Sequence, residues 1–258
     1  MPWAAAVSHI ENGSEPLRNP LTRLAKRVVR LWPGPVLARR RGARFILHPQ
    51  NWIDNRLLAG VPFENEQIAA ARALIRQHGI DLVIDIGANI GLYCILLGQM
   101  PAVKSVLAFE PVRRNYAQLM GNVFVNGLAG KVEAHRLALG ARADETVIFV
   151  DPTSTGVSRL DLAAAHRDQA DFSHQETVRV ACFDDVCAFE HRRAFVKIDV
   201  EGGAADALKG MEKFLDRNTA VIQVETSDNE EDGVFKFLLA KGFANVRRIG
   251  ADCYFVRM

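Results

Sequence analysis

Short apolar segments alternate with amphipathic segments along most of the chain. Apolar runs that fit buried strands cover residues 81–87, 105–111, 194–202 and 219–225, and stretches of helical periodicity separate them. Strands of this kind joined by helices are typical of a parallel sheet that is covered on both faces. Two further strand-like segments near the C-terminus, 244–250 and 253–258, are joined too tightly for a crossover helix. They predict an antiparallel hairpin over 244–258. We therefore expect an α/β fold with a mostly parallel sheet and a C-terminal antiparallel pair.

The segments that flank this pattern suggest how the chain is divided. Residues 43–49 (ARFILHP) predict a strand, and residues 64–79 predict a helix that stops at Gly79. From about residue 141 to 180 the regular pattern gives way to a polar insertion. We expect its residues 151–175 to act as an acceptor-binding loop or lid, because long irregular segments are usually functional or disordered. The predicted parts are a basic N-terminal arm (1–41) and one domain (42–258).

Charge is distributed unevenly and is concentrated in the arm. No Asp or Glu lies between residues 16 and 53, whereas nine Arg and Lys residues do. Within this segment Leu21, Leu24, Val28 and Leu31 follow helical spacing, with basic residues between them. We favour a helix that packs on the main domain with its arginines solvated. The alternative is peripheral contact of residues 18–44 with an anionic membrane surface or partner.

Composition excludes several classes of protein. The chain is 49% hydrophobic and 24% charged, which is typical of a soluble globular protein. The four cysteines form no CxxC pair, so neither a zinc site nor a disulfide framework is indicated. No apolar run approaches the roughly 20 residues of a membrane span, and the N-terminus lacks the features of a secretory signal. We expect a cytoplasmic protein, and the sequence leaves its oligomeric state open.

The stretch VIDIGANIG (83–91) contains the first candidate chemistry. Asp85 ends a buried strand, and Gly87 and Gly91 follow it at a spacing that matches neither GxGxxG nor a P-loop. We expect the glycines to let the backbone pass close to a ligand. Asp85 would repel a phosphate but can accept hydrogen bonds from an ammonium group. A helix-capping aspartate is the alternative explanation for Asp85 on its own.

Glu110 ends the next strand and strengthens this interpretation. A carboxylate at that position can accept hydrogen bonds from both hydroxyls of a ribose. A ligand that has a ribose and an amino-acid ammonium group but no phosphate is S-adenosylmethionine. Asp85, Gly87, Gly91 and Glu110 together therefore predict that S-adenosylmethionine is the cofactor.

The sequence resembles the FkbM-family methyltransferases from about residue 42 onward. The resemblance rests on VIDIGANIG (83–91), AFEP (108–111), RLALG (136–140), FVKIDVEG (195–202) and LKG (208–210). It implies a seven-stranded, Rossmann-like class I methyltransferase fold. It also implies methyl transfer from S-adenosylmethionine to a hydroxyl of a sugar, glycan, glycolipid or natural product. The family's acidic position upstream corresponds to Glu64. Gly203 and Ala204 depart from the family pattern, which usually has an aromatic or apolar residue and a second glutamate there.

The candidate site combines these observations. The cofactor-binding set is Asp85, Gly87, Ala88, Asn89, Gly91, Glu110, Pro111, Ala138 and Asp199. In an extended FVKIDVEG, the side chains of Lys197, Asp199 and Glu201 point to one side, and a lysine in an apolar strand needs a partner such as Asp199. We assign Asp199 or Glu201 as the base or hydroxyl-orienting group, with Lys197 as their neighbour. The candidate substrate-contacting residues are Glu64 and Glu225.

Other assignments remain open at this point. His135, His166 and His174 are rival bases, and three strand-end carboxylates (Asp199, Glu201 and Glu225) resemble a Mg²⁺ ligand set, although we predict no metal. A methyltransferase-fold binding partner of weakened activity is one alternative function, given Gly203 and Ala204. A nicotinamide-dependent oxidoreductase is another. A nucleic-acid substrate is disfavoured because no aromatic residues interleave with a basic face near the site.

Overall fold

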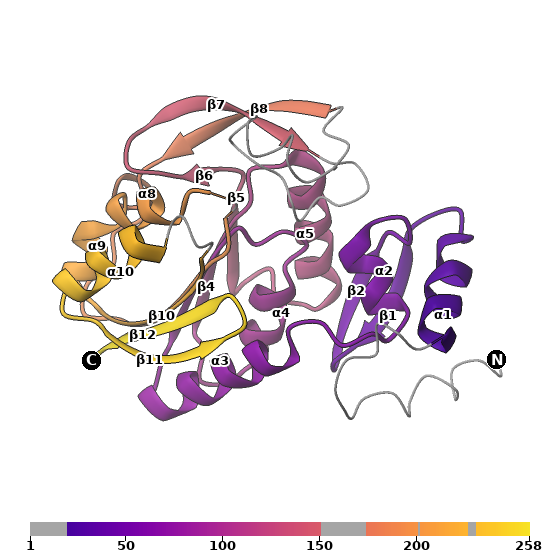
Figure 1. The fold of residues 1–258 in the computed structure, drawn as a ribbon, viewed down its shortest axis with the longest axis horizontal. Coiled ribbons are helices and arrows are strands. Elements are labelled where there is room, and N and C mark those ends of the chain that lie inside the picture. Colours follow the sequence, from indigo (N-terminus) through magenta and orange to yellow (C-terminus); the bar gives the residue numbers. More distant parts are fainter. Residues whose placement is uncertain (1–19, 151–173, 201, 227–230) are drawn as a thin grey trace.

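A seven-stranded sheet forms the centre of the computed structural model, which describes residues 20–150, 174–200, 202–226 and 231–258 (Figure 1). In chain order the strands of the sheet are β3 (Leu82–Ile86), β4 (Ser105–Phe109), β5 (Val132–His135), β9 (Arg193–Ile198), β10 (Thr219–Glu225), β11 (Ala244–Ile249) and β12 (Asp252–Arg257). Their spatial order is β11-β12-β10-β9-β3-β4-β5, and the strands from β10 to β5 run parallel. β12 pairs antiparallel with β10 and β11. The predicted sheet and its C-terminal hairpin are confirmed.

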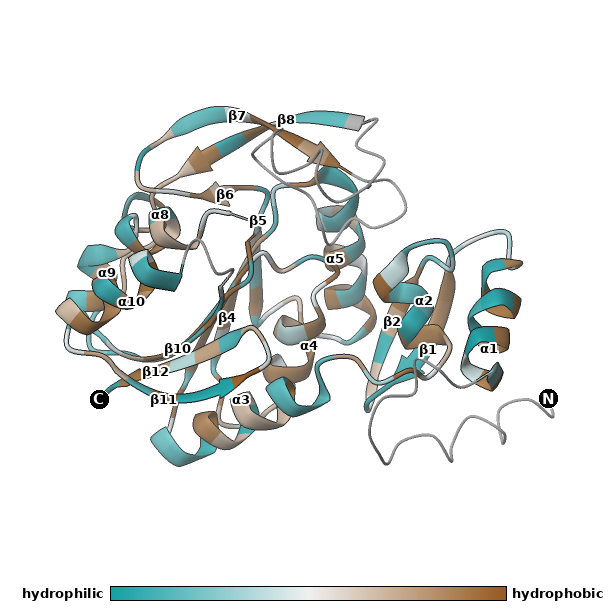
Figure 2. Cartoon of the chain, viewed as in Figure 1, coloured by the Kyte–Doolittle hydropathy of each residue, from teal (hydrophilic) through white to brown (hydrophobic). Residues whose placement is uncertain are grey.

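Helices cover both faces of the sheet because its strands are apolar on both sides. Val83 packs with the helices of one face, whereas its neighbours Leu82 and Ile84 pack with those of the other. The central strands are accordingly brown in Figure 2. Among the described residues no helix is both long and apolar enough to cross a membrane. The first face is covered by α3 (Asn65–His78), α4 (Leu92–Gly98) and α5 (Arg113–Val125), and the second by α8 (Ala204–Lys209), α9 (Glu212–Arg217) and α10 (Glu231–Ala240).

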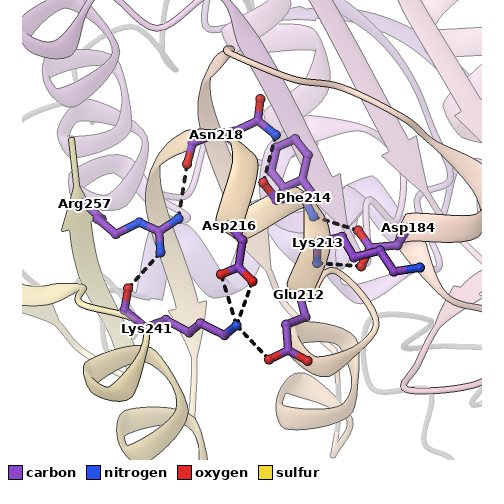
Figure 3. Close-up of polar contacts among 8 residues, drawn as sticks. All are labelled: Asp184, Glu212, Lys213, Phe214, Asp216, Asn218, Lys241 and Arg257. Carbon is purple, nitrogen blue, oxygen red and sulfur yellow. Dashed lines mark hydrogen bonds and ion pairs between the residues drawn. The ribbon is translucent and has the colours of Figure 1, made fainter.

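Polar contacts fasten the second helical face at its outer side (Figure 3). The short helix α9 has no side-chain cap of its own. Asp184, in the one-turn helix α7 (Phe183–Val186), supplies one, because its carboxylate accepts hydrogen bonds from the backbone N–H groups of Lys213 and Phe214, each at 2.8 Å. Lys241 after α10 reaches Asp216 at 3.0 Å. These contacts hold α7, α9 and the end of α10 together.

The N-terminal elements form a group that packs against α5. They are α1 (Pro20–Arg30), β1 (Val36–Arg40), β2 (Ala43–Leu47) and α2 (Trp52–Leu58), with β1 and β2 paired as an antiparallel hairpin. The backbone of Ile46 bonds the side chains of Asn122 (2.7 Å) and Gln118 (2.8 Å) on α5. The predicted strand at residues 43–49 is confirmed. The predicted border after residue 41 falls in the turn of this hairpin, so backbone pairing joins the arm to the segment that follows it.

The predicted irregular insertion contains strands, which corrects the expectation for its two ends. β7 (Asp144–Val150) pairs antiparallel with β8 (His174–Ala181), and β8 also pairs with the short β6 (Ala138–Leu139). Alternation in β7 is partial, since only Ile148 and Val150 are buried while the apolar Val147 on the opposite side is 38% exposed. A strand with one covered face leaves a weaker apolar signal than one covered on both faces. Of the segment expected to act as a lid (151–175), residues 151–173 lie outside the described residues, and residues 174 and 175 belong to β8.

Candidate active site

A cavity of about 310 Å³ lies at the carboxyl ends of β3, β4, β9 and β10. Parallel strands all end at the same edge of a sheet, so their last residues meet there although they are far apart in sequence. Gly91 does not line this cavity, and Glu201 lies outside the described residues. The other predicted site residues all line it, namely Glu64, Asp85, Gly87, Ala88, Asn89, Glu110, Pro111, Ala138, Lys197, Asp199 and Glu225.

Asp85 combines the two roles that the sequence left open. The residue is almost fully buried in β3, and its Oδ2 accepts a hydrogen bond from the backbone N–H of Cys94 in α4 at 3.0 Å. Its Oδ1 is buried and has no hydrogen-bond partner in the described structure. Burial raises the pKa of this carboxyl to about 6. An unsatisfied oxygen of this kind is unfavourable unless a ligand supplies a donor, so Asp85 both caps α4 and offers an acceptor to the cavity.

Glu110 holds the loop after β3 in place from the end of β4. Its carboxylate accepts hydrogen bonds from the backbone N–H groups of Asn89 at 2.8 Å and Val112 at 2.9 Å. Burial raises its pKa to about 7, although these N–H donors act in the opposite direction. Each carboxylate oxygen has two lone pairs, so these bonds leave capacity for a ligand hydroxyl. Glu110 therefore shapes the cavity wall and can still contact a ligand.

Lys197 and Asp199 form the ion pair that their positions in the strand predicted. Nζ of Lys197 lies 2.6 Å from Oδ2 of Asp199 and 4.6 Å from the ring centroid of Tyr93. Burial alone would raise the pKa of Asp199, but the charge of Lys197 lowers it below its ordinary value. The charge of Asp199, followed by burial, raises the pKa of Glu225 to about 8, and the two carboxyl groups share a hydrogen bond. At neutral pH Asp199 is thus the ionised member and Glu225 the protonated member of this pair.

Glu64 enters the cavity from the start of α3. It has a left-handed backbone (φ 54°), an uncommon conformation for a glutamate that is often found at functional sites. Burial raises its pKa to about 7, and its carboxyl group shares a hydrogen bond with Tyr93. The hydroxyl of Tyr93 also accepts a hydrogen bond from Nε2 of Gln223 at 3.0 Å. The sequence analysis missed Tyr93 and Gln223. A polar group in the aliphatic run LYCILL and another in the apolar strand TAVIQVE were the available signals.

Two glycines of the VIDIGANIG stretch are required by packing of the protein itself. A Cβ at Gly87 would lie 1.8 Å from the backbone oxygen of Asp199, and one at Gly91 would lie 2.5 Å from Cδ1 of Leu119. Both residues have positive φ, at 80° and 86°. The expected reason for these glycines, close approach of a ligand, is therefore replaced by close approach of the end of β9 and of α5. Gly87 nevertheless lines the cavity.

The alternative bases are histidines, and the alternative use of the carboxylates is to bind a metal ion. His135 stacks on Phe109, with ring centroids 5.0 Å apart, and is not among the residues that line the cavity. His166 and the side chain of His174 lie outside the described residues. In the part of the chain that the structure describes, no three His, Cys, Asp or Glu side chains are grouped so that they could hold a metal ion.

The raised carboxyl pKa values predict how stability depends on pH. Burial raises the pKa of Asp85 to about 6 and those of Glu64 and Glu110 to about 7. The unfolded chain ionises these groups near pH 4, so the folded state binds more protons and loses stability as pH rises through these values. Asp199 has a lowered pKa, and its contribution is lost only on acidification below its unfolded value of 3.8. We expect the free energy of unfolding of the ligand-free protein to fall by on the order of a few kcal/mol between pH 5 and pH 8.

Urea unfolding at a series of pH values measures this effect directly. Glu110→Gln removes one of the buried titrations and should flatten the curve between pH 5 and pH 8. A stability that stays level or rises over this interval would contradict the burial of ionisable groups around the cavity.

Comparison with known proteins places this arrangement in a family. The family model described as the methyltransferase FkbM domain matches residues 85–254, which include both strand-end carboxylates and the Lys197–Asp199 pair. The chain belongs to the FkbM methyltransferase family. A curated relative is "Methyltransferase 1" of Beauveria bassiana (strain ARSEF 2860), which is 28% identical over 180 residues, covering 63% of this chain and 72% of the relative. The family resemblance inferred from sequence is confirmed.

A solved structure of the same family agrees in fold. The crystal structure of methyltransferase FkbM from Methylobacillus flagellatus KT has a TM-score of 0.50 and 15% identity, and the similarity covers 92% of this chain. This chain spans only 59% of the length of that protein. The two residues that depart from the FkbM pattern lie beside each other: Gly203 lines the cavity, and Ala204 is fully buried at the start of α8. The position of the second family glutamate is therefore occupied by a core residue here.

Proposed function

We propose that this FkbM-family protein is an S-adenosylmethionine-dependent O-methyltransferase that acts on a hydroxyl of a sugar, glycan, glycolipid or natural product. The observation that carries the proposal is the buried, unpartnered Oδ1 of Asp85 at the cavity wall, which calls for a hydrogen-bond donor. Carboxyl groups also outnumber cationic groups in the described lining, where Lys197 faces Glu64, Asp85, Asp199 and Glu225. A wall of this charge suits a cationic ligand and disfavours a pyrophosphate.

The residues at the strand ends fit the parts of S-adenosylmethionine. Asp85 would accept hydrogen bonds from its ammonium group, and Glu110 would accept them from its ribose hydroxyls. The loop Gly87-Ala88-Asn89 lies between these two carboxylates, with Oδ1 of Asn89 buried and without a partner in the described structure. When bound, the sulfonium supplies a methyl group bonded to a good leaving group. The protein then has to align an acceptor oxygen and take up its proton.

The pKa values distinguish the carboxyl groups that could take up the proton. Asp199 was our sequence-based choice, but Lys197 stabilises its ionised form and makes it a weak base. Glu64, with a pKa raised to about 7, is partly ionised at neutral pH and matches the range in which a general base is effective, whereas Glu225, with a pKa raised to about 8, is protonated there. We therefore infer that Asp199 and Lys197 orient the acceptor hydroxyl and that Glu64 accepts its proton. Glu201 remains a candidate from sequence.

Binding and transfer can be tested separately. Calorimetric titration of the purified full chain with S-adenosylmethionine should give micromolar affinity, whereas NAD should give no heat of binding. Incubation with methyl-labelled S-adenosylmethionine and a fractionated glycan and metabolite extract should label a component whose mass increases by one CH₂. Affinity for NAD alone would favour the oxidoreductase alternative. Tight S-adenosylmethionine binding without transfer to any extract fraction would favour the non-catalytic alternative.

A further inference from the structure

Helix α1 turns its apolar residues away from the protein. Leu24, Val28 and Leu31 are 57%, 58% and 82% exposed, whereas Thr22 is buried. A helix that packs on a domain through its apolar stripe shows the opposite arrangement. The helix packs on the rest of the protein with its arginines exposed, as the sequence favours, but the apolar stripe is not the packed side. Figure 1 shows α1 at the outer edge of the molecule, beyond α2, and Figure 2 shows that it carries both hydrophobic and hydrophilic residues.

The orientation of α1 is fixed by contacts on its inner side. The helix packs against α2, and the side chain of Asn55 on α2 donates a hydrogen bond to the backbone oxygen of Lys26 at 3.1 Å. Just beyond the helix, Nε2 of Gln50 donates to the backbone oxygen of Trp32 at 2.8 Å. The helix is thus anchored by these polar contacts and by Val29, which packs against the core, while the stripe faces outward.

Exposed cations flank the stripe. Arg23, Arg27 and Arg30 are exposed, and each precedes an apolar residue by one position, about 100° around the helix axis. None of the three has an ion-pair partner in the described parts of the chain. Burial, and then the charges of Arg56 and Arg30, lower the pKa of Lys26. This side of the molecule is therefore both apolar and electropositive.

We propose that the α1 face (Leu24, Val28, Leu31 and Trp32 with Arg23, Arg27 and Arg30) binds the surface of an anionic lipid bilayer. A helix that lies in the plane of a membrane buries its apolar stripe at the level of the headgroups while flanking cations contact anionic lipids. Trp32 is 59% exposed at the end of the stripe, and tryptophan is favoured at the interface between membrane and water. A nucleic acid would leave the leucines in contact with phosphate. The stripe therefore favours lipid over nucleic acid.

The proposal can be tested with vesicles and the full chain. Sedimentation with phosphatidylcholine vesicles that contain phosphatidylserine should carry the protein down, and vesicles of phosphatidylcholine alone should do so at least about tenfold less well. Added salt should weaken the binding. Two triple variants remove one property each: Leu24→Gln with Val28→Gln and Leu31→Gln, and Arg23→Gln with Arg27→Gln and Arg30→Gln. Each should lower the affinity for anionic vesicles at least about tenfold.

Matched controls change equally exposed residues elsewhere. The apolar control is Phe124→Gln with Leu239→Gln and Val246→Gln, and the charge control is Arg179→Gln with Lys213→Gln and Lys236→Gln. Both should bind anionic vesicles like the unaltered chain, and circular dichroism checks that all four variants fold. Absence of vesicle binding by the full chain, or equal losses in variants and controls, would overturn the proposal. So would a dimer in solution that only the α1 apolar variant dissociates, because a second copy would then occupy the stripe.

Discussion

Asp85→Asn is expected to weaken binding of S-adenosylmethionine at least about 100-fold, which corresponds to roughly 2.8 kcal/mol. The substitution removes the negative charge beside the proposed ammonium position. In the unaltered protein the backbone nitrogen of Cys94 lies 3.0 Å from Oδ2 of Asp85. Asparagine keeps an oxygen that can accept this hydrogen bond, so the cap of α4 is retained. Because burial penalises the charged carboxylate, the free energy of unfolding should stay level or rise at pH 8. Calorimetric titration and urea unfolding on the same protein measure the two quantities.

Asp54→Asn is the matched control for this experiment. Asp54 is also a buried aspartate whose pKa burial raises to about 6, and it accepts hydrogen bonds from His48 and Gln118 without lining the cavity. Its substitution should leave the affinity for S-adenosylmethionine within about threefold of the original. Unchanged affinity in the Asp85 variant would remove the central support for the proposed function. Alanine is a poorer choice at Asp85, because losing the cap would mix stability with binding.

The sheet and most of the site could be predicted because both follow from local sequence. Strands that are apolar at nearly every position, such as LVIDI, identify a sheet buried on both faces. Once the strands are parallel, their carboxyl ends must meet. Asp85, Glu110 and Asp199 could therefore be assigned to one cavity without knowledge of any distance. The Lys197–Asp199 pair is also local, since side chains two residues apart in a strand share a face.

Features that depend on contacts between distant segments could not be predicted in this way. The spacing of Leu24, Val28 and Leu31 defines a stripe but not the direction in which it faces, which depends on the anchoring of α1 by Asn55 and Gln50. The strands β7 and β8 pair with each other, and in β7 only Ile148 and Val150 are buried, so their apolar pattern is too short to identify them as strands. The raised pKa of Glu225 arises from Asp199 on the adjacent strand, a pairing set by the sheet and not by either local sequence.

Helix α2 contacts both the cavity and the proposed membrane-binding helix α1. Trp52 and Ile53 at the start of α2 line the cavity, and the same helix packs against α1. If α1 rests on a bilayer, α2 lies between the membrane-facing helix and the cavity. An acceptor carried by a lipid would then reach the cavity over a short path, which makes glycolipids the first acceptors to test within the proposed class.

Gly87→Ala is expected to destabilise the protein by at least about 3 kcal/mol or to prevent its accumulation in folded form. A Cβ at this position would lie 1.8 Å from the backbone oxygen of Asp199, and a φ of 80° is itself unfavourable for alanine. Backbone atoms at the ends of two adjacent strands cannot move apart without breaking the pairing that places Asp85 beside Lys197. Urea unfolding measures the loss where folded protein is obtained.

Gly127→Ala separates the steric effect from the backbone effect. Gly127 has a φ of 68° but no atom within 4 Å of the added Cβ, so this variant should lose only about 1–2 kcal/mol. Gly91→Ala should fall between the two, because the Cβ would meet Cδ1 of Leu119 at 2.5 Å, and a side-chain end can shift more easily than a backbone oxygen. Equal losses of unfolding free energy in the Gly87 and Gly127 variants would mean that the residues after β3 and β9 are not in close contact at the cavity. The carboxylates at their ends could not then hold one ligand between them.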